Sequence, residues 1–306
     1  MKFVADIDIP FLKGVLEPYG EVVYKKGLDI CRDDIIDADA LLIRTRTRCD
    51  EELLDGTKVS IITTATIGTD HIDLDYCSSH GIEVANASGC NAGGVMQYVF
   101  SALYGIAARK GIKIDGATIG IVGVGNVGRR IEYMADYLGF KVLRCDPPRA
   151  QKEGPEGFCS LEQLLAESDI VTLHVPLDEN TRGMANADFF TLMKPGAIFI
   201  NAARGEVVNE EALLEAAPKM GAIVIDTWNH EPSVNEELID VVDIATPHIA
   251  GYSYQGKQNA TILAVRAIAR YFGFRQLEEF TTEDKDASHE PVLLDLKGKN
   301  HGEIAA

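Results

Sequence analysis

The stretch IDTWNHEP at residues 225–232 places Asp226, His230 and Glu231 close together after an apolar run. Carboxylates and imidazoles are ligands for metal ions, and they also transfer protons in enzymes. The stretch alone therefore fits three kinds of site: a metal site, a catalytic pair of His230 and Glu231, or half of a site that a distant residue completes. The residues that other strands deliver to the same place must decide between them.

Further chemically active residues end apolar runs elsewhere in the chain. Arg204 follows AIFINAA, and His248 ends DIATPH. Ligands of open α/β sheets bind beyond the carboxyl ends of the strands, where these residues would gather. Arginine can hold a carboxylate through two parallel hydrogen bonds, and histidine with a carboxylate partner can take the proton of an alcohol. With Asp226 and Glu231 they indicate a hydride-transfer site, although each alone could simply satisfy a loop or a turn.

The stretch TIGIVGVGNVGRRI contains Gly123, Gly125 and Gly128 in the spacing GxGxxG between an apolar strand and a helix. In dinucleotide-binding folds these glycines allow the turn, the approach of a pyrophosphate and close packing of helix on strand. The next run, KVLRCD, ends at Asp146, whose carboxylate can bind the adenosine ribose. We therefore expect NAD rather than NADP, because Asp146 would repel the extra phosphate. Arg149 is interpreted as a solvated loop arginine rather than a phosphate clamp.

Composition narrows the function classes. A chain of 306 residues with 46% hydrophobic content is long enough for two domains, and its formal net charge of −18 disfavours nucleic-acid and anionic membrane partners. The beginning MKFVADIDIP does not resemble a signal peptide, and six scattered cysteines suit a reducing compartment. We expect a cytoplasmic protein. The stretch GTDHIDLD is rich in metal-ligand residue types. Asp70 is expected to cap a helix and the others to lie in that helix, so they would not converge on a metal ion and no metal site is predicted.

Two series of short apolar runs alternate with helical segments, in residues 2–86 and 118–248. This pattern predicts an α/β protein with two open parallel-sheet domains, a flavodoxin-like substrate domain and a Rossmann NAD-binding domain. Residues 1–90 with 252–306 are expected to form the discontinuous substrate domain, and residues 91–251 the dinucleotide-binding domain. A helix at 92–110 should link them, and from about residue 278 the chain looks like a solvated tail.

The order GxGxxG, NAARG, DTWNHEP and TPHIAG resembles that of the D-isomer-specific 2-hydroxyacid dehydrogenases over about residues 1–275. The stretches TTATIGTDHID, GCNAGGV, CDPPRA and TPHIAGYSYQGK add to the resemblance. It implies that Arg204 anchors the substrate carboxylate, that His248 is the general acid/base, and that Glu231 is the partner of His248.

The resemblance also implies binding residues. Those expected at NAD are Gly123, Gly125, Asn126, Val127, Gly128, Asp146, Val175, Gly251 and, at the nicotinamide end, Asp226. Those expected at the substrate are Thr45, Thr66 and Tyr252. The stretch IRTRTRCD supplies Arg44, Arg46 and Arg48, which would share one side of an extended segment and could hold a phosphate. Arg44 or Arg46 is favoured for that role, and a solvated basic loop is the alternative.

The implied activity is NAD-dependent oxidation of 4-phospho-D-erythronate at its 2-hydroxyl, a step of pyridoxal 5'-phosphate biosynthesis. A homodimer is expected, with the helix at 92–110 as a candidate surface. The alternatives are a dehydrogenase of another D-2-hydroxy acid, such as 3-phosphoglycerate, or a non-catalytic NAD(H)-sensing protein. The set of Arg204, Glu231 and His248 argues against the sensor, since a sensor needs no proton acceptor. His230 is left without a role.

Overall fold

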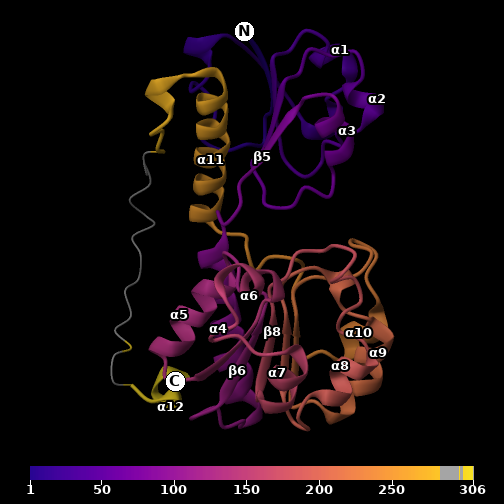
Figure 1. The fold of residues 1–306 in the computed structure, drawn as a ribbon, viewed down its shortest axis with the longest axis vertical. Coiled ribbons are helices and arrows are strands. Elements are labelled where there is room, and N and C mark those ends of the chain that lie inside the picture. Colours follow the sequence, from indigo (N-terminus) through magenta and orange to yellow (C-terminus); the bar gives the residue numbers. More distant parts are fainter. Residues whose placement is uncertain (283–295, 297–298, 306) are drawn as a thin grey trace. The chain divides into compact units, whose positions relative to one another are not determined.

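The computed structural model describes residues 1–282, 296 and 299–305, which form two compact α/β units (Figure 1). Unit 1 contains Met1–Asn91 and the segment that begins at Ser253. Unit 2 contains Ala92–Tyr252 and the described carboxy-terminal residues 299–305. Each unit has one sheet, and all strand pairs in both sheets are parallel, which confirms the predicted fold class.

The sheet of unit 1 has five strands in the order β2-β1-β3-β4-β5. They are β1 (Lys2–Asp6), β2 (Glu21–Lys25), β3 (Ala40–Ile43), β4 (Ile61–Thr64) and β5 (Glu83–Asn86). The helices of this unit are α1 (Arg32–Ile35), α2 (Glu51–Leu54), α3 (Leu74–Ser79) and α11 (Tyr254–Phe272). Helix α11 contacts β4 and β5, so the chain returns to the first sheet after the Ala92–Tyr252 segment of unit 2 (Figure 1).

Both faces of this sheet are covered. Phe3 and Ala5 join the apolar cluster that includes Ile268 of α11, whereas Val4 joins the opposite cluster with Ile35 of α1. Alternate residues of a strand point to opposite faces, so a strand buried on both sides must be apolar at successive positions. This burial explains the uninterrupted apolar runs in the sequence.

The sheet of unit 2 has six strands in the order β11-β10-β9-β8-β6-β7. They are β6 (Thr118–Val122), β7 (Lys141–Cys145), β8 (Ile170–Leu173), β9 (Ile198–Asn201), β10 (Ala222–Ile225) and β11 (Ile244–Ala245). The described helices are α4 (Ala92–Lys110), α5 (Gly128–Tyr137), α6 (Pro147–Glu153), α7 (Leu161–Glu167), α8 (Ala187–Leu192), α9 (Glu210–Ala216), α10 (Glu236–Val241) and α12 (His301–Ala305). Because β6 pairs with both β7 and β8, the strand order reverses there, which is where such sheets bind ligands.

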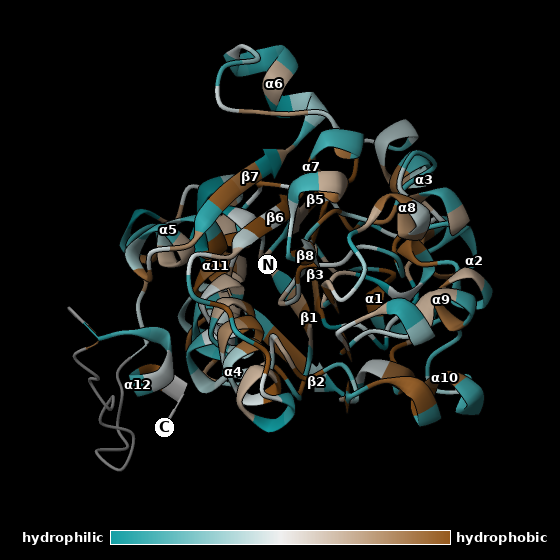
Figure 2. Cartoon of the chain, turned by 90° about the horizontal axis from the view of Figure 1, so that it is seen from below, coloured by the Kyte–Doolittle hydropathy of each residue, from teal (hydrophilic) through white to brown (hydrophobic). Residues whose placement is uncertain are grey.

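The core of unit 2 also lies on both faces of its sheet. Ile119 and Ile121 of β6 pack in the cluster with α4 and α5, while Phe199 of β9 packs on the other side with α8. Figure 2 shows β6 largely in the colour of apolar residues and the outer helix α6 largely in that of polar residues. The strand side chains therefore form the core, and the polar residues at the carboxyl ends of the strands lie outside it, where they can form a site.

Helix α4 matches the helix predicted at 92–110, and Gly111 follows it with a φ of +67°. Most of its apolar residues pack in the core of unit 2, and exposed positions include Gln97, Ser101 and Gly105. No helix in the described part of the chain is both long and apolar enough to cross a membrane.

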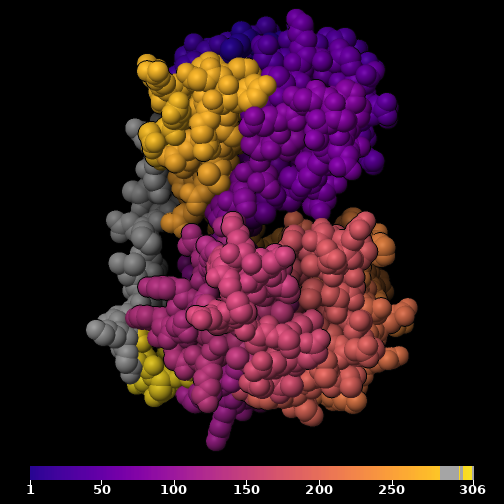
Figure 3. Space-filling view, in the orientation of Figure 1, coloured from indigo at the N-terminus to yellow at the C-terminus, as the bar shows by residue number. Residues whose placement is uncertain are grey.

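The carboxy-terminal helix α12 corrects one prediction. His301 is only 8% exposed, its Nδ1 lies 2.5 Å from the hydroxyl of Tyr104, and its ring lies 4.6 Å from the Phe140 ring. Residues 299–305 therefore belong to unit 2, not to the substrate domain or to a solvated tail, because Tyr104 of α4 and Phe140, which directly precedes β7, bind the imidazole. Figure 3 shows their yellow surface against unit 2. Residues 283–295, 297–298 and 306 of the predicted tail lie outside the described residues.

Candidate active site

Three glycines in the turn after β6 have different surroundings. Gly123 has a φ of +86°, and a Cβ there would lie 2.7 Å from the carbonyl carbon of His174. A Cβ on Gly128 would lie 2.1 Å from the carbonyl oxygen of Gly123, so its absence lets α5 start close to β6. A Cβ on Gly125 would meet nothing within 4 Å. The open space over Gly125 fits a pyrophosphate that approaches the backbone amides of the turn.

Asp146 connects this turn to α6. Its Oδ2 accepts a 2.8 Å hydrogen bond from the backbone N–H of Val124, and its Oδ1 accepts one of 3.0 Å from that of Arg149. The guanidinium of Arg149 donates to Glu153 at 2.9 and 2.7 Å and to the carbonyl of Val124 at 2.7 Å. Arg149 is thus a paired residue of α6 rather than a solvated loop arginine, and its charge is balanced by Glu153.

The other residues predicted at the cofactor lie in two places. Val175 contacts the glycine turn, because its Cγ1 is 2.8 Å from where a Cβ on Gly123 would be. Asn126 is exposed in the same turn, and Val127 is half-buried at the start of α5. Gly251 lies in a turn next to Ala250, whose N–H donates to Asp226.

A braced turn carries Arg204. Asn201, buried at the end of β9, accepts a 3.0 Å bond from the N–H of Ala203 and donates one of 3.0 Å to the carbonyl of Arg204. The Arg204 guanidinium donates to the Ala203 carbonyl at 2.8 Å. A Cβ on Gly205 would lie 2.0 Å from the carbonyl carbon of Trp228. The Arg204 turn is therefore packed directly against the segment that contains Glu231.

Asp226 holds the turn that presents His248. It is 1% exposed, and its Oδ1 accepts bonds from the hydroxyl of Thr246 at 2.6 Å and from the N–H of Ile249 at 2.8 Å. Its Oδ2 accepts a 2.8 Å bond from the N–H of Ala250. His248 has a φ of +54°, in the left-handed region that side chains rarely occupy. The carboxylate stabilises this conformation by binding the backbone that follows it.

Glu231 and His248 form a pair. Oε2 of Glu231 lies 2.8 Å from Nδ1 of His248, and Oε1 accepts a 2.8 Å bond from the N–H of Trp228. Because Nδ1 faces a carboxylate, it carries the proton in the neutral ring, and Nε2 is the basic nitrogen. The two side chains are 35% and 44% exposed, so a substrate can reach them.

His230 does not join this pair. It is exposed in a turn with a φ of +58°, where its carbonyl accepts a 2.8 Å bond from the N–H of Ser233. Among the described residues there is no group of three or more His, Cys, Asp or Glu side chains that could hold a metal ion. In the other acid-rich stretch, Asp73 rather than Asp70 caps α3, accepting a bond of 2.8 Å from the N–H of Tyr76.

The arginines after β3 are arranged differently from the prediction. The chain turns directly after Arg44, so the one-sided arrangement expected of an extended segment is wrong. Arg44 donates to the carbonyl of Asp8 at 3.1 Å, and Arg48 lies 2.7 Å from a carboxylate oxygen of Asp50. Arg46 is exposed and has no hydrogen-bond or ion-pair partner among the residues that the structure describes.

The other residues predicted to bind substrate are accessible to different degrees. Thr45 is exposed in the turn after β3. Thr66 is half-buried after β4, with its hydroxyl 2.5 Å from that of Thr64. Tyr252, at the end of the Ala92–Tyr252 segment of unit 2, is 67% exposed. All three lie beyond the carboxyl ends of strands.

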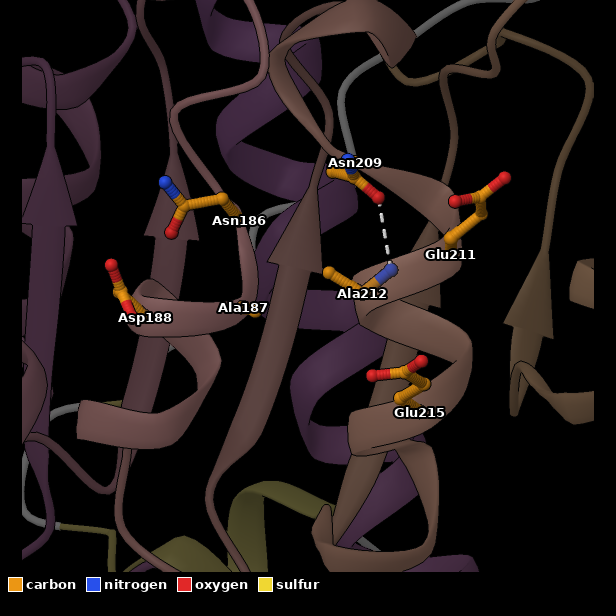
Figure 4. A pocket seen from close by; sticks show the side chains of 7 residues that line it. All are labelled: Asn186, Ala187, Asp188, Asn209, Glu211, Ala212 and Glu215. Atoms are coloured by element: carbon orange, nitrogen blue, oxygen red, sulfur yellow. Dashed lines mark hydrogen bonds between the residues drawn. The ribbon is translucent and has the colours of Figure 1, made fainter.

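Two cavities in the described part of unit 2 are similar in size. One, of about 420 Å³, is mainly apolar and lies beside the pair of Glu231 and His248, with Trp228 in its wall. The other, of about 390 Å³, lies at the starts of α8 and α9 and contains Asp188, Glu211 and Glu215 (Figure 4). The carboxylates of the second cavity would repel an anionic substrate, so the first is the one that belongs to the candidate site.

Comparison with known proteins identifies the family. Residues 101–250 match the model of the D-isomer specific 2-hydroxyacid dehydrogenase NAD-binding domain. The chain is 46% identical over 288 residues to erythronate-4-phosphate dehydrogenase of Bacteroides thetaiotaomicron, covering 92% of this chain and 83% of that protein. For the protein of the same name from Chromohalobacter salexigens the identity is 43%, covering 89% and 73%. The chain belongs to the D-isomer specific 2-hydroxyacid dehydrogenase family.

A solved structure shows the same fold as this chain. D-Lactate dehydrogenase from Aquifex aeolicus, complexed with NAD and lactic acid, superposes with a TM-score of 0.76 at 26% identity, covering 90% of this chain and 97% of that one. The chain is therefore an NAD-dependent oxidoreductase, which confirms the predicted enzyme class and cofactor. The open turn at Gly125 and the carboxylate of Asp146 fit this dinucleotide.

Three positioning residues of this dehydrogenase were absent from the sequence predictions. Asn201 braces the Arg204 turn, Trp228 binds Glu231 through its backbone, and Thr246 binds Asp226. The polar Asn201 at the end of an apolar strand was a usable signal. Trp228 and Thr246 gave none, because their importance depends on contacts with residues distant in the chain.

Proposed function

We propose that the chain oxidises 4-phospho-D-erythronate at its 2-hydroxyl to 2-oxo-3-hydroxy-4-phosphobutanoate with NAD, in pyridoxal 5'-phosphate biosynthesis. The observation that carries the chemistry is the 2.8 Å contact between Glu231 and His248, in the same unit as the glycine turn. The choice of substrate is supported by relatives 42–47% identical that are named erythronate-4-phosphate dehydrogenase.

In the proposed reaction, Nε2 of His248 takes the proton of the 2-hydroxyl, and Glu231 stabilises the imidazolium that results. Arg204 binds the carboxylate of the substrate and aligns the C2–H bond. NAD, held by the turn at Gly125 and by Asp146, would supply the hydride acceptor for C2. The substrate thus loses a hydride to the cofactor and a proton to His248, which then releases the proton to solvent.

A panel of substrates tests this assignment. NADH formation is measured under one condition with 4-phosphoerythronate, 3-phosphoglycerate, D-lactate and D-glycerate, and the highest kcat/KM is expected for the first. Good turnover of another acid without turnover of 4-phosphoerythronate would contradict the substrate assignment but not the family. NADH binding without turnover of any 2-hydroxy acid would favour the non-catalytic sensor.

We also propose that Arg46 binds the phosphate, since Arg44 and Arg48 have protein partners. Arg46→Gln should raise KM for the phosphorylated substrate about tenfold and leave the Kd of NADH unchanged. Arg48→Gln removes the same charge from the same turn and is the matched control. Equal effects of the two variants would indicate a general electrostatic contribution rather than a specific contact.

The proposed setting is a cytoplasmic homodimer without nucleic-acid or membrane partners, in keeping with the net charge of −18. The substrate is anionic, so its binding depends on local cations and not on the charge of the whole molecule. Light scattering at working concentration should give twice the mass of 33.3 kDa. A monomeric mass would contradict the dimer without affecting the catalytic proposal.

A further inference from the structure

Two short hydrogen bonds connect Tyr98 of α4 to Asp226, which holds the turn that presents His248. We call this turn, residues 246–250, the catalytic turn. The hydroxyl of Tyr98 lies 2.6 Å from Oγ1 of Thr246, and that oxygen lies 2.6 Å from Oδ1 of Asp226. The single hydroxyl proton of Thr246 must go to the carboxylate, which can only accept. Tyr98 is therefore the donor to Thr246, and the two bonds form a directed chain from α4 to Asp226.

Thr246 is a branch point within the site. Its backbone carbonyl accepts a 2.8 Å bond from the indole N–H of Trp228, whose own backbone N–H binds Glu231. Its hydroxyl binds Asp226, which holds the turn of His248. A displacement of Thr246 would therefore affect both members of the proposed acid/base pair.

We propose that Tyr98 is a positioning residue for His248 and Glu231, acting through Thr246 and Asp226. The role rests on the proposed acid/base function of His248. Tyr98 itself contributes one donor from the rigid helix α4, which is anchored in the core of unit 2. Without it, Thr246 loses the bond that fixes the direction of its hydroxyl, and the strained turn at His248 loses part of its support.

The environment of Tyr98 suits a permanent donor. Burial raises the pKa of its phenol, and the charge of Asp226 adds to this effect. The hydroxyl therefore keeps its proton at neutral pH, so it can donate its hydrogen bond to Thr246 throughout that range. A phenylalanine would preserve the packing of the ring and remove only this donor.

The test compares two tyrosines of the same helix. Tyr98→Phe and Tyr104→Phe each remove one hydroxyl of α4 that has a side-chain partner, but the Tyr104 hydroxyl binds His301 instead of the catalytic turn. For Tyr98→Phe, kcat should fall about tenfold while KM and the Kd of NADH change less than about twofold. Tyr104→Phe should lower the melting temperature similarly and leave kcat unchanged.

The hydroxyl of Thr246 supplies a second comparison. Thr246→Ser keeps the acceptor and donor and should retain most of kcat, whereas Thr246→Val removes both and should lose at least as much as Tyr98→Phe. Adding Tyr98→Phe to Thr246→Val should lower kcat little further, because the hydrogen bonds from Tyr98 through Thr246 to Asp226 are already broken.

Three results would overturn the role of Tyr98: wild-type kcat in Tyr98→Phe, equal losses of kcat in the Tyr98 and Tyr104 variants, or additive losses in the double variant. Failure of the proposed function is seen separately, as normal turnover in His248→Asn. The assays use whichever 2-hydroxy acid the substrate panel shows to be oxidised, so a wrong substrate does not obscure the result.

Discussion

Oε2 of Glu231 and Nδ1 of His248 lie 2.8 Å apart, although 17 positions separate the two residues in the chain. The other oxygen of Glu231 is held by the N–H of Trp228, so the carboxylate has a fixed orientation. Such a partner sets the tautomer of a histidine and stabilises the imidazolium formed when it accepts a proton.

His248→Asn should bind NADH normally and lose turnover by about 10²–10⁴-fold, since it removes the proposed proton acceptor. Glu231→Gln should lose about 10²-fold, because its amide cannot stabilise an imidazolium by charge. His230→Ala, next to Glu231 but unpaired with His248, is the control and should stay within about twofold of wild type. Steady-state kinetics and NADH fluorescence measure both properties, and a severe effect of His230→Ala would return the adjacent pair to consideration.

Two glycine substitutions separate folding from cofactor binding. Gly128→Ala places a methyl 2.1 Å from the carbonyl oxygen of Gly123, so it should lower the melting temperature or prevent folding. Gly125→Ala meets nothing within 4 Å and should fold normally, but its methyl would occupy the space proposed for the pyrophosphate. We expect about tenfold weaker NADH binding in that variant. Unchanged affinity would place the pyrophosphate elsewhere.

Asp226→Asn should reduce both stability and turnover. The amide can accept at only one of its two positions, while the carboxylate accepts from Thr246, Ile249 and Ala250. Losing a hydrogen bond to a charged group costs about 1.5–3 kcal/mol, and the turn of His248 should loosen as well. Urea unfolding and kcat measure the two effects. Asp188→Asn, in the acid-lined cavity, is the control, and equal stability of both variants would argue against the bracing role.

Stability should depend on pH through His174. Burial lowers the pKa of His174 to about 3 from its ordinary 6.5. Between these values the unfolded chain binds a proton that the folded chain does not, so this group makes stability fall as the pH drops through that window. From pH 7 to pH 5 its share of the loss in unfolding free energy should be about 2 kcal/mol.

Urea unfolding of His174→Gln at both pH values isolates this share. The variant should lose about 2 kcal/mol less than wild type between pH 7 and pH 5. His80→Gln, which replaces an exposed histidine, should follow the wild-type curve. Parallel curves for wild type and His174→Gln would show that His174 is protonated as readily in the folded state as in the unfolded chain.

Local sequence determined the parts of this protein whose physics is local. The apolar runs within residues 2–86 became strands of unit 1, and its central strands β1, β3 and β4 are continuously apolar because both faces of the sheet are buried there. The GxGxxG spacing predicted the turn at Gly123. A φ of +86° and close contacts at this position favour glycine, so the residue type itself indicated the turn. The polar residues after the strands identified the candidate site, because parallel strands place their carboxyl ends at one edge.

Tertiary structure decided which of those residues act together. In IDTWNHEP, Asp226 supports His248 by binding the backbone of its turn, and Glu231 supports it by binding its ring. His230 makes no hydrogen bond to either the turn or the ring of His248. The link from Tyr98 to Thr246 spans 148 positions, and the burial of His301 depends on two distant aromatic rings. Hydrogen bonds and ring contacts depend on distances of a few ångströms, which residues far apart in the chain acquire only when the sheet and helices have packed.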